Sequence, residues 1–207
     1  MGFYSRLVLP RLIDWTMQSE EAARYRRKLV PQAHGVVLEL GIGSGLNLPF
    51  YTYAVQRIVG LDPSSELLRR GKVRSSRSPV PVHMVQGVAE RLPIEKESID
   101  TVVLTWALCS VSDVRQTLSE ARRVLRTSGQ LLFVEHGLAP EPHVACWQHR
   151  LDSFWSCVSC HLDRPVDALI TAAGFRVREL DTAYLGKGPK IMTYMYTGVE
   201  IPARNTV

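Results

Sequence analysis

Short apolar segments that alternate with helical ones are the feature that most restricts how this chain can fold. The apolar segments are residues 36–40, 56–61, 80–85, 101–105 and 130–134, and helical patterns cover residues 64–74, 111–125 and 165–173. Strands separated by helices form βαβ units around a parallel sheet. An uninterrupted apolar run such as Val102-Val103-Leu104 is typical of a strand covered on both faces. The sequence therefore predicts an α/β fold, with helices on both faces of a mostly parallel sheet.

Two further apolar segments complete the predicted sheet. Residues 175–180 and 191–197 follow the last helical pattern, and the stretch between them contains Gly186, Gly188 and Pro189. Because so short a connection favours an antiparallel hairpin, we expect these two strands at one edge of the sheet. The prediction is a sheet of seven strands in which the last strand is antiparallel.

The length of 207 residues fits one domain with a substantial core, so we predict a single domain over residues 1–207. Residues 1–35 have a mostly helical pattern with many apolar side chains, which predicts an N-terminal helical lid over the ligand-binding edge of the sheet. Residues 137–164 form an insertion between the fifth strand and the last helix, and they are rich in aromatic side chains and histidine. We expect this insertion to border the same edge.

Charge and composition limit the partners of this chain. The net charge of +5 includes basic clusters within residues 24–28 and 69–77. Solvated helix faces explain these clusters, and attraction to an anionic lipid surface is the alternative. No aromatic-interleaved basic segment accompanies them, so we expect no nucleic acid partner. No apolar run approaches the ~18 residues of a membrane span, and no secretory signal is visible, which predicts a cytoplasmic protein, with peripheral contact at the inner membrane face as the alternative.

The cysteines are weak evidence for a metal site. Cys157 and Cys160 form a C-x-x-C pair followed by His161, and Cys146 lies upstream. A zinc site needs further ligands, but Cys146 and the histidines near it fall in one predicted helical stretch rather than in a second ligand pair. The C-x-x-C-H pattern also matches a c-type haem attachment, which the lack of an export signal disfavours. We therefore expect no bound metal and reduced thiols.

A glycine-rich loop directly after the first strand is the strongest sign of a ligand site. It reads Glu39-Leu40-Gly41-Ile42-Gly43-Ser44-Gly45, and Asp62 ends the second strand 17 positions after Gly45. Glycines permit a sharp turn and close approach of backbone N–H groups, and the Asp62 carboxylate suits two ribose hydroxyls. The Glu39 carboxylate would repel the pyrophosphate of a dinucleotide but suits a cationic ligand. The pattern points to S-adenosylmethionine, which combines a sulfonium, an amino acid tail and a ribose.

Further motifs accompany this loop. They are Gly60-Leu61-Asp62-Pro63, Ala89-Glu90-Arg91-Leu92-Pro93, Ser98-Ile99-Asp100-Thr101-Val102 and Arg123-Val124-Leu125-Arg126-Thr127-Ser128-Gly129. Together they resemble the class I S-adenosylmethionine-dependent methyltransferases, which implies a Rossmann-like sheet. Leu108-Cys109-Ser110-Val111, Val134-Glu135-His136, Trp147-Gln148 and Cys160-His161-Leu162 are more similar to the thiol methyltransferase (methyltransferase-like 7) family and its small bacterial relatives. The similarity extends over residues 30–200.

The resemblance implies a set of cofactor-binding residues on the loops that follow the first four strands. They are Glu39, Gly41, Gly43, Gly45, Asp62, Pro63, Val88, Ala89 and Thr105. The glycines would surround the methionine part of S-adenosylmethionine, Asp62 would hold the ribose, and Pro63 would lie beside the adenine. Many relatives have an acidic residue where Val88 stands, so the contact to the adenine amino group differs here. Thr105 would line the floor near the sulfonium.

Methyl transfer from a sulfonium is an in-line displacement that requires an aligned nucleophile and exclusion of water. His136 ends the fifth strand, at the edge where ligands of parallel sheets bind, and is a candidate base or orienting residue. His161 is the second catalytic candidate. The alternative for both histidines is a structural hydrogen bond or ion pair. The candidate acceptor-pocket residues are Tyr4, Trp106, Cys109, Trp147 and Arg164, for which ordinary core packing or ion pairing is the alternative.

The predicted activity is methyl transfer to a small-molecule acceptor, and the resemblance favours the sulfur of a thiol or sulfide. Methylation of a phospholipid amine or a quinone at the membrane surface is the closest alternative, since basic clusters and an apolar N-terminal helix would serve docking there. A cofactor-binding module without catalysis and a nicotinamide dehydrogenase are the alternatives from other classes. The sequence carries no signal for an oligomeric state.

Overall fold

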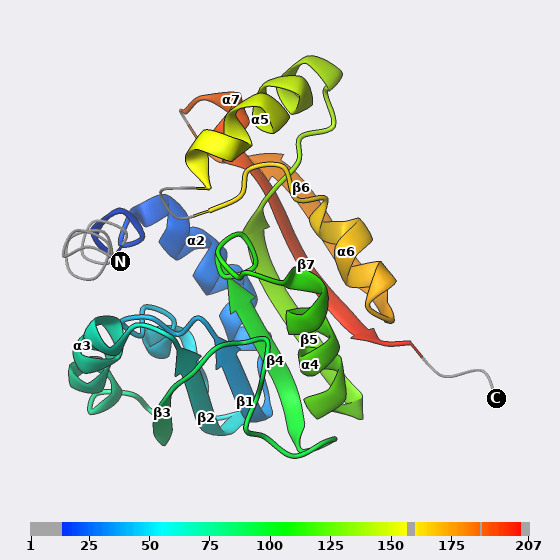
Figure 1. Cartoon of the computed structure of the whole chain (residues 1–207). Coiled ribbons are helices and arrows are strands. Elements are labelled where there is room, and N and C mark those ends of the chain that lie inside the picture. The colour runs from blue at the N-terminus through cyan, green and yellow to red at the C-terminus, as the bar shows by residue number, and fades with distance from the viewer. Residues whose placement is uncertain (1–13, 157–159, 187, 204–207) are drawn as a thin grey trace.

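The computed structural model describes residues 14–156, 160–186 and 188–203, and these residues form one seven-stranded sheet with the strand order β3-β2-β1-β4-β5-β7-β6 (Figure 1). The strands are β1 (Gly35–Leu40), β2 (Val55–Asp62), β3 (Val82–Gln86), β4 (Ile99–Thr105), β5 (Leu125–His136), β6 (Phe175–Tyr184) and β7 (Tyr194–Pro202). β1 to β5 pair in parallel, and β7 pairs antiparallel with both β5 and β6. The predicted α/β fold, with a mostly parallel sheet and an antiparallel last strand, is confirmed.

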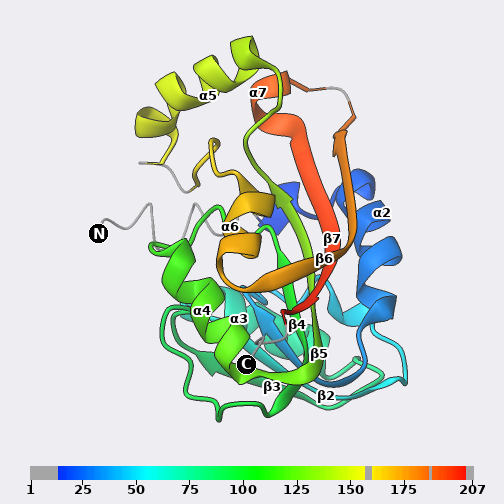
Figure 2. The same cartoon turned by 90° about the vertical axis from the view of Figure 1, so that its right-hand side faces the viewer.

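Helices cover both faces of the sheet, as Figure 2 shows with the sheet between α2 on one side and α4 and α6 on the other. The helices are α2 (Glu20–Leu29), α3 (Ser65–Ser75), α4 (Val114–Val124), α5 (Pro142–Trp155), α6 (Val166–Ala172) and the short α7 (Lys190–Thr193). Two short 3-10 helices, η2 (Val30–Gln32) and η3 (Leu48–Phe50), connect other elements. Side-chain caps fix where three helices begin: Ser19 accepts from Ala22 N, Ser64 from Leu67 N, and Asp113 from Gln116 N.

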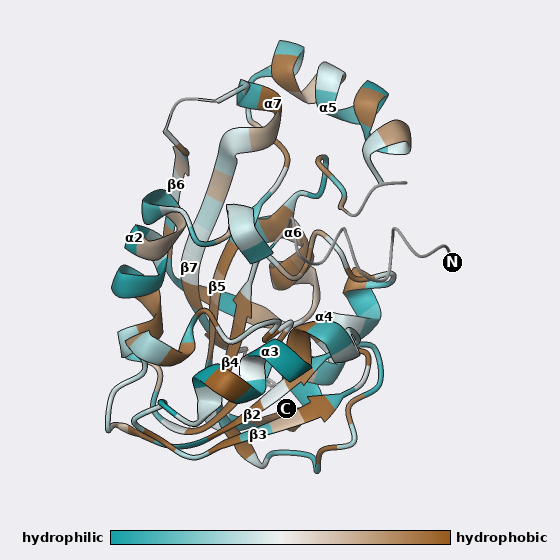
Figure 3. Cartoon of the chain, turned by 90° about the vertical axis from the view of Figure 1, so that its left-hand side faces the viewer, coloured by the Kyte–Doolittle hydropathy of each residue, from teal (hydrophilic) through white to brown (hydrophobic). Residues whose placement is uncertain are grey.

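The apolar core consists of two clusters, one on each face of the sheet. On one face, Leu118 and Ala121 of α4 and Ile170 of α6 pack on alternate residues of the central strands. On the other face, Leu29 of α2 and Leu68 of α3 pack on the remaining ones. Brown accordingly predominates in the central part of the sheet in Figure 3, while β7 is paler and the helices alternate between teal and brown. The continuous apolar character of the central strands thus reflects burial on both sides.

Several element boundaries differ from the sequence predictions, and β6 and β7 extend to Tyr184 and Pro202 rather than to 180 and 197. β5 begins at Leu125, five residues before the predicted start at 130, because α4 ends at Val124 and the chain pairs at once with Ile99 of β4. The strand predicted over residues 191–197 is wrong at its beginning, where α7 covers Lys190–Thr193. Pro189 stands immediately before α7, and its fixed backbone angle favours the start of a helix.

Parallel pairing brings the ends of β1, β2, β4 and β5 to the same edge of the sheet. α5 and α7 pack on each other beyond this edge, at the top of Figure 1. Ligands of parallel α/β sheets bind outside the carboxyl ends of the strands. Among the helices of the described residues, none has the length and apolar character that a membrane span requires.

Candidate functional site

The glycine-rich loop after β1 adopts a conformation that only glycine accommodates readily. Gly41, Gly43 and Gly45 have φ angles of 75°, 54° and 79°, in the left-handed region. A Cβ atom on Gly41 would also lie 3.0 Å from the Cβ of Ala107. The loop leads into the 3-10 helix η3 and not into an α-helix, so it lacks the helix N-terminus on which dinucleotide folds bind pyrophosphate.

Asp62 faces this loop from the end of β2. Its carboxylate accepts hydrogen bonds from the backbone N–H of Gly43 at 2.9 Å and of Ser64 at 2.8 Å. Burial raises the pKa of Asp62, and these two hydrogen bonds partly oppose the increase. Each carboxylate oxygen retains a lone pair, so Asp62 can also accept hydrogen bonds from a ligand.

Glu39, the penultimate residue of β1, is almost completely buried below the loop. Its carboxylate accepts hydrogen bonds from Asn47 Nδ2 at 2.9 Å and from the Tyr51 hydroxyl at 2.7 Å. Burial raises its pKa to about 7, although both hydrogen bonds and the nearby Arg26 guanidinium lower it. A cationic ligand above the loop would favour the ionised form of this carboxyl group.

Arg26 of α2 belongs to the basic cluster that sequence analysis interprets as a solvated helix face, and for this residue that interpretation is wrong. Its side chain is 4% exposed and donates hydrogen bonds to Asn47 Oδ1 at 3.0 Å and to the Met17 carbonyl at 2.7 Å. The guanidinium also lies 5.1 Å from the centroid of the Trp106 ring. Burial lowers its pKa to about 10.

The helical spacing of residues in α2 explains why Arg26 points inward, and this spacing can be read from the sequence. Ala22, Arg26 and Leu29 are spaced by four and three residues, and all three are buried on one stripe of α2. Asn47 joins Arg26 to the strand ends, because its Nδ2 also donates to Thr105 Oγ1 at 2.9 Å. No sequence motif marks Asn47, whose importance lies in this three-way contact.

A second polar cluster fixes the outer side of the glycine-rich loop. Asp14 accepts a short hydrogen bond from the Ser44 hydroxyl, and Arg70 of α3 lies 3.4 Å from the Asp14 carboxylate. Arg74 donates to the Ser44 carbonyl at 2.9 Å. Arg70 and Arg74, which belong to the basic cluster within residues 69–77, therefore connect α3 to Asp14 and to the glycine-rich loop.

The loops after β2 and β3 form the next part of the site. Pro63, Val88 and Ala89 line the same space as the glycine-rich loop. The neighbouring Glu90 points elsewhere, because its carboxylate accepts hydrogen bonds from the backbone N–H of Ser112 at 2.8 Å and of Asp113 at 3.2 Å. Glu90 therefore does not replace the acidic residue that many relatives have at the position of Val88.

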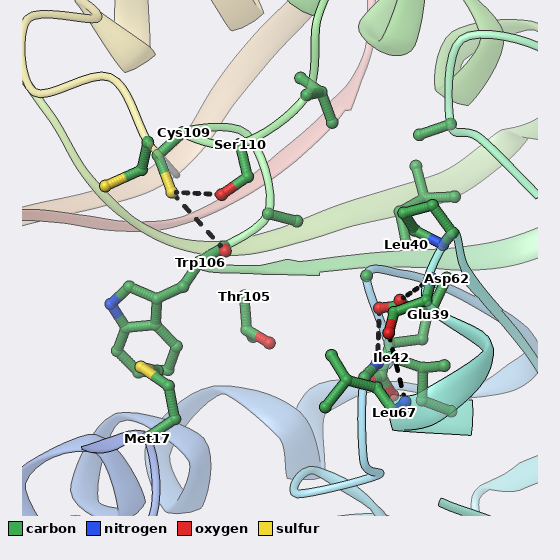
Figure 4. A pocket seen from close by; sticks show the side chains of 18 of the residues that line it. Met17, Glu39, Leu40, Ile42, Asp62, Leu67, Thr105, Trp106, Cys109 and Ser110 are labelled. Carbon is green, nitrogen blue, oxygen red and sulfur yellow. Dashed lines mark hydrogen bonds between the residues drawn. The ribbon is translucent and has the colours of Figure 1, made fainter. Parts of the chain in front are cut away.

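These loops surround a cavity of about 790 Å³, within the size range of small-molecule sites. Figure 4 shows Glu39 and Asp62 on one side of it, and Trp106 with Cys109 on the other. The described lining residues include three acids, Asp14, Glu39 and Asp62, besides Glu90, whose carboxylate is turned to the loop before α4, but only one arginine, Arg26, and no lysine. This excess of negative charge suits a cationic ligand better than a phosphate.

The far end of the cavity is formed where β4 and β5 end. Its lining residues come from the end of β4 and the loop after it, from the end of β5, from the end of α5 and the segment that follows, and from α7. They are Thr105, Trp106, Ala107, Cys109, Ser110, Val111, His136, Trp155, Cys160, Leu162 and Met192. Cys109 Sγ lies 3.7 Å from the Trp106 carbonyl oxygen and 3.5 Å from Ser110 Oγ (Figure 4). A hydrogen bond with Cys109, together with burial, raises the pKa of the Cys160 thiol.

Four candidates lie outside the described lining of the cavity. Gly45 packs against Leu48, to whose Cδ1 a Cβ atom on this glycine would come within 2.7 Å. His161 Nδ1 is 2.8 Å from Asp152 Oδ2, the Trp147 ring lies 5.6 Å from the Arg150 guanidinium on the surface of α5, and Arg164 donates to the carbonyl groups of Leu108 and Val111. His161 thus forms the ion pair that was its alternative, whereas Trp147 is exposed rather than part of the core and Arg164 binds backbone carbonyls rather than a carboxylate. Tyr4 lies outside the described residues. The predicted lid and insertion contribute through other residues, among them Met17, Arg26 and Trp155.

Glu135, next to His136, anchors the loop after β4. Its carboxylate accepts hydrogen bonds from the backbone N–H of Ala107 at 2.7 Å and of Leu108 at 3.0 Å. Burial raises its pKa to about 7. The side chains of neighbouring strand residues point in opposite directions, which leaves His136 directed at the cavity.

Comparison with known proteins identifies the family. A family described as "Methyltransferase domain" matches residues 38–133. Thiol S-methyltransferase TMT1B of Rattus norvegicus is 32% identical over 166 residues, which are 75% of this chain and 68% of the relative. Phosphatidylethanolamine N-methyltransferase of Cereibacter sphaeroides is 30% identical over 72% of this chain and 74% of the relative. The chain is an S-adenosylmethionine-dependent methyltransferase.

A solved structure confirms the fold of this methyltransferase. The YcgJ protein of Bacillus subtilis superimposes with a TM-score of 0.68 over 89% of this chain and 99% of that one, at 17% identity. The cofactor of the family is S-adenosylmethionine, and the cavity fits it. Gly41 and Gly43 bring the backbone of the loop to the cavity surface, and the carboxylates of Glu39 and Asp62 match a cation with hydroxyl donors.

Proposed function

We propose that this methyltransferase methylates the sulfur of a small thiol or sulfide. The observation that carries the proposal is the chemistry of the far end of the cavity. Its described lining between Thr105 and Val111, together with His136, Trp155, Cys160, Leu162 and Met192, contains neither a carboxylate nor a lysine or arginine. A neutral, weakly solvated thiol suits such a lining, whereas an ammonium group would find no countercharge there.

The opposite end of the cavity is proposed to hold the cofactor. When bound, S-adenosylmethionine supplies a methyl group on a positively charged sulfur. Gly41 and Gly43 would border its methionine part, beside Glu39, while Gly45 would keep the loop in shape through its N–H bond to the Ile42 carbonyl. Asp62 would accept hydrogen bonds from the ribose hydroxyls. Pro63, Val88 and Ala89 would border the adenine, and Thr105 and Trp106 would line the floor between the two ends.

The similarity to TMT1B, whose name describes a thiol S-methyltransferase, supports this acceptor class. A phospholipid amine is the second candidate, because the similarity to the phosphatidylethanolamine enzyme is about as strong. The exposed aromatic side chains of α5 favour this second candidate, since Trp147 and Phe154 are 54% and 71% exposed and aromatic residues bind well at lipid interfaces.

An acceptor panel with methyl-labelled S-adenosylmethionine tests the proposal. The panel contains alkyl and aryl thiols, sulfide, a quinol, and vesicles with and without phosphatidylethanolamine. We expect label in thioether products, without any requirement for vesicles. Label in phospholipid, with none in any thiol, would overturn the proposal in favour of the second candidate.

A further inference from the structure

Two cysteines and a histidine meet at the far end of the cavity. Cys109 comes from the loop after β4, His136 ends β5, and Cys160 lies between α5 and α6. One ligand atom of each residue, Sγ or a ring nitrogen, lies within 4.8 Å of the other two. All three residues line the cavity, and the two cysteines are free thiols.

This set of ligands matches a tetrahedral zinc ion with one open position. Catalytic zinc sites use three protein ligands, such as two cysteines and one histidine, and leave the fourth position for substrate or water. Zinc bonds of about 2.3 Å to sulfur and about 2.0 Å to nitrogen place neighbouring ligand atoms roughly 3.3–3.8 Å apart. Side-chain movements of about 1 Å therefore suffice to close the observed cluster around an ion.

Hydrogen bonds hold the three segments in place around this cluster. The backbone N–H of His161 donates to the Cys109 carbonyl at 2.8 Å, which links the segments of the two cysteines. Glu135 holds the residues directly before Cys109, and Arg164 donates to the carbonyls of Leu108 and Val111. Asp152 accepts from the backbone N–H of Leu162 at 2.7 Å. Supporting contacts of this kind orient metal ligands and increase metal affinity.

We propose that Cys109, His136 and Cys160 bind a zinc ion whose fourth position faces the cavity. Two thiolates neutralise the charge of the ion, so the occupied site adds no net charge to a partly buried pocket. Asp152, His161 and Asp163 form a second group of metal-ligand type. We assign it no metal, because Asp152 pairs with His161 and Asp163 pairs with His149, and none of the four lines the cavity.

The open coordination position gives the zinc ion a role in binding the acceptor, and this role rests on the proposed function, in which the acceptor is a thiol. When the acceptor binds the ion, its S–H bond breaks, a sulfur–zinc bond forms, and the proton passes to solvent. The acceptor is then held as a thiolate, which is the nucleophilic form of sulfur. The ion would thereby replace a general base, and it would keep the sulfur at a fixed place near the proposed cofactor end.

Metal analysis of the full-length protein, purified under reducing conditions, tests the site. We expect about one zinc per chain for the wild type and for C146S, whose cysteine is exposed on α5. C109S and C160S should retain less than about a tenth of this zinc against a competing chelator. H136Q provides a third variant, and circular dichroism verifies that each variant is folded. Wild-type protein without zinc affinity, or C109S and C160S with wild-type zinc content, would overturn the proposal. A Cys109–Cys160 disulfide that persists under these reducing conditions would also overturn it.

Cobalt substitution separates the metal site from the choice of acceptor. Cobalt-loaded protein should show a sulfur-to-cobalt charge-transfer band, and added thiol should change the visible spectrum if it enters the fourth position. Full thiol methylation by zinc-free protein would refute the inference and leave the proposed function intact. A zinc-bound protein that methylates only phospholipid would refute the proposed function and, with it, the role of the ion in activating a thiol.

Discussion

Replacement of Asp62 by asparagine should weaken cofactor binding strongly while leaving the fold intact. The carboxylate accepts hydrogen bonds from Gly43 N and Ser64 N, and asparagine can accept only one of the two and presents an N–H group to the other. Hydrogen bonds to charged groups contribute about 1.5–3 kcal/mol, against about 0.5–1.5 kcal/mol for neutral ones. Weakened hydrogen bonds to the ribose add to the loss of loop order, so we expect a total cost on the order of 2–3 kcal/mol in binding.

Such a cost corresponds to an increase of roughly 30- to 150-fold in the Kd of S-adenosylmethionine or S-adenosylhomocysteine. Isothermal titration calorimetry with S-adenosylhomocysteine measures it. The matched control is D113N, since Asp113 caps α4 outside the cavity lining and asparagine caps helices about as well as aspartate. A Kd for D62N within about twofold of that of D113N would refute the assignment of Asp62 to the ribose.

Three further predictions concern stability. Burial raises the folded-state pKa of Glu39 from 4.5 to about 7, so between these pH values the folded protein holds a proton that the unfolded chain releases. Relative to E39Q, the wild type should therefore lose on the order of 2–3 kcal/mol of unfolding free energy from about pH 5 to pH 8, as measured by urea titrations. A difference between the two proteins that does not change with pH would contradict this. G41A and G174A should each lose about 1–2 kcal/mol of unfolding free energy from left-handed strain. Only G41A should also weaken S-adenosylhomocysteine binding in calorimetric titrations, because Gly41 lines the cavity and Gly174 does not, and equal binding by both variants would contradict this. R164Q should lower stability by roughly 2–4 kcal/mol in thermal melts, since it removes two hydrogen bonds to the loop after β4, and an unchanged melting temperature would show that this clamp is dispensable.

The sheet and its ligand edge could be predicted from sequence because both depend on local patterns. Continuous apolar runs marked the five parallel strands, and the glycine spacing with Asp62 marked the edge where they end. The start of β5 could not be predicted, since Leu125 pairs with Ile99 of β4, and the polar residues 126–129 fall in a register shift before pairing resumes at Gln130. Local sequence was also misleading at residues 191–193, where Pro189 starts a short helix ahead of β7.

The polar network of the site depends on tertiary contacts that local patterns do not contain. Asn47 has no motif of its own, yet it contacts Glu39, Thr105 and Arg26. Sequence analysis predicts no metal because it compares only the spacing within the stretch that contains Cys146, Cys157 and Cys160. The cluster of Cys109, His136 and Cys160 forms from three separate segments, and only the fold brings them together.

The attachment of Asp14 to Ser44 and of Arg26 to Asn47 joins the beginning of the described chain to the cofactor end of the cavity. Occupancy of the site and order in this early segment are thus thermodynamically linked. A ligand that tightens the glycine-rich loop should slow protease cleavage before α2. Conversely, an enzyme shortened to begin at β1 would lack Asp14, Met17 and Arg26 from the wall of the pocket, although all seven strands of its sheet would remain.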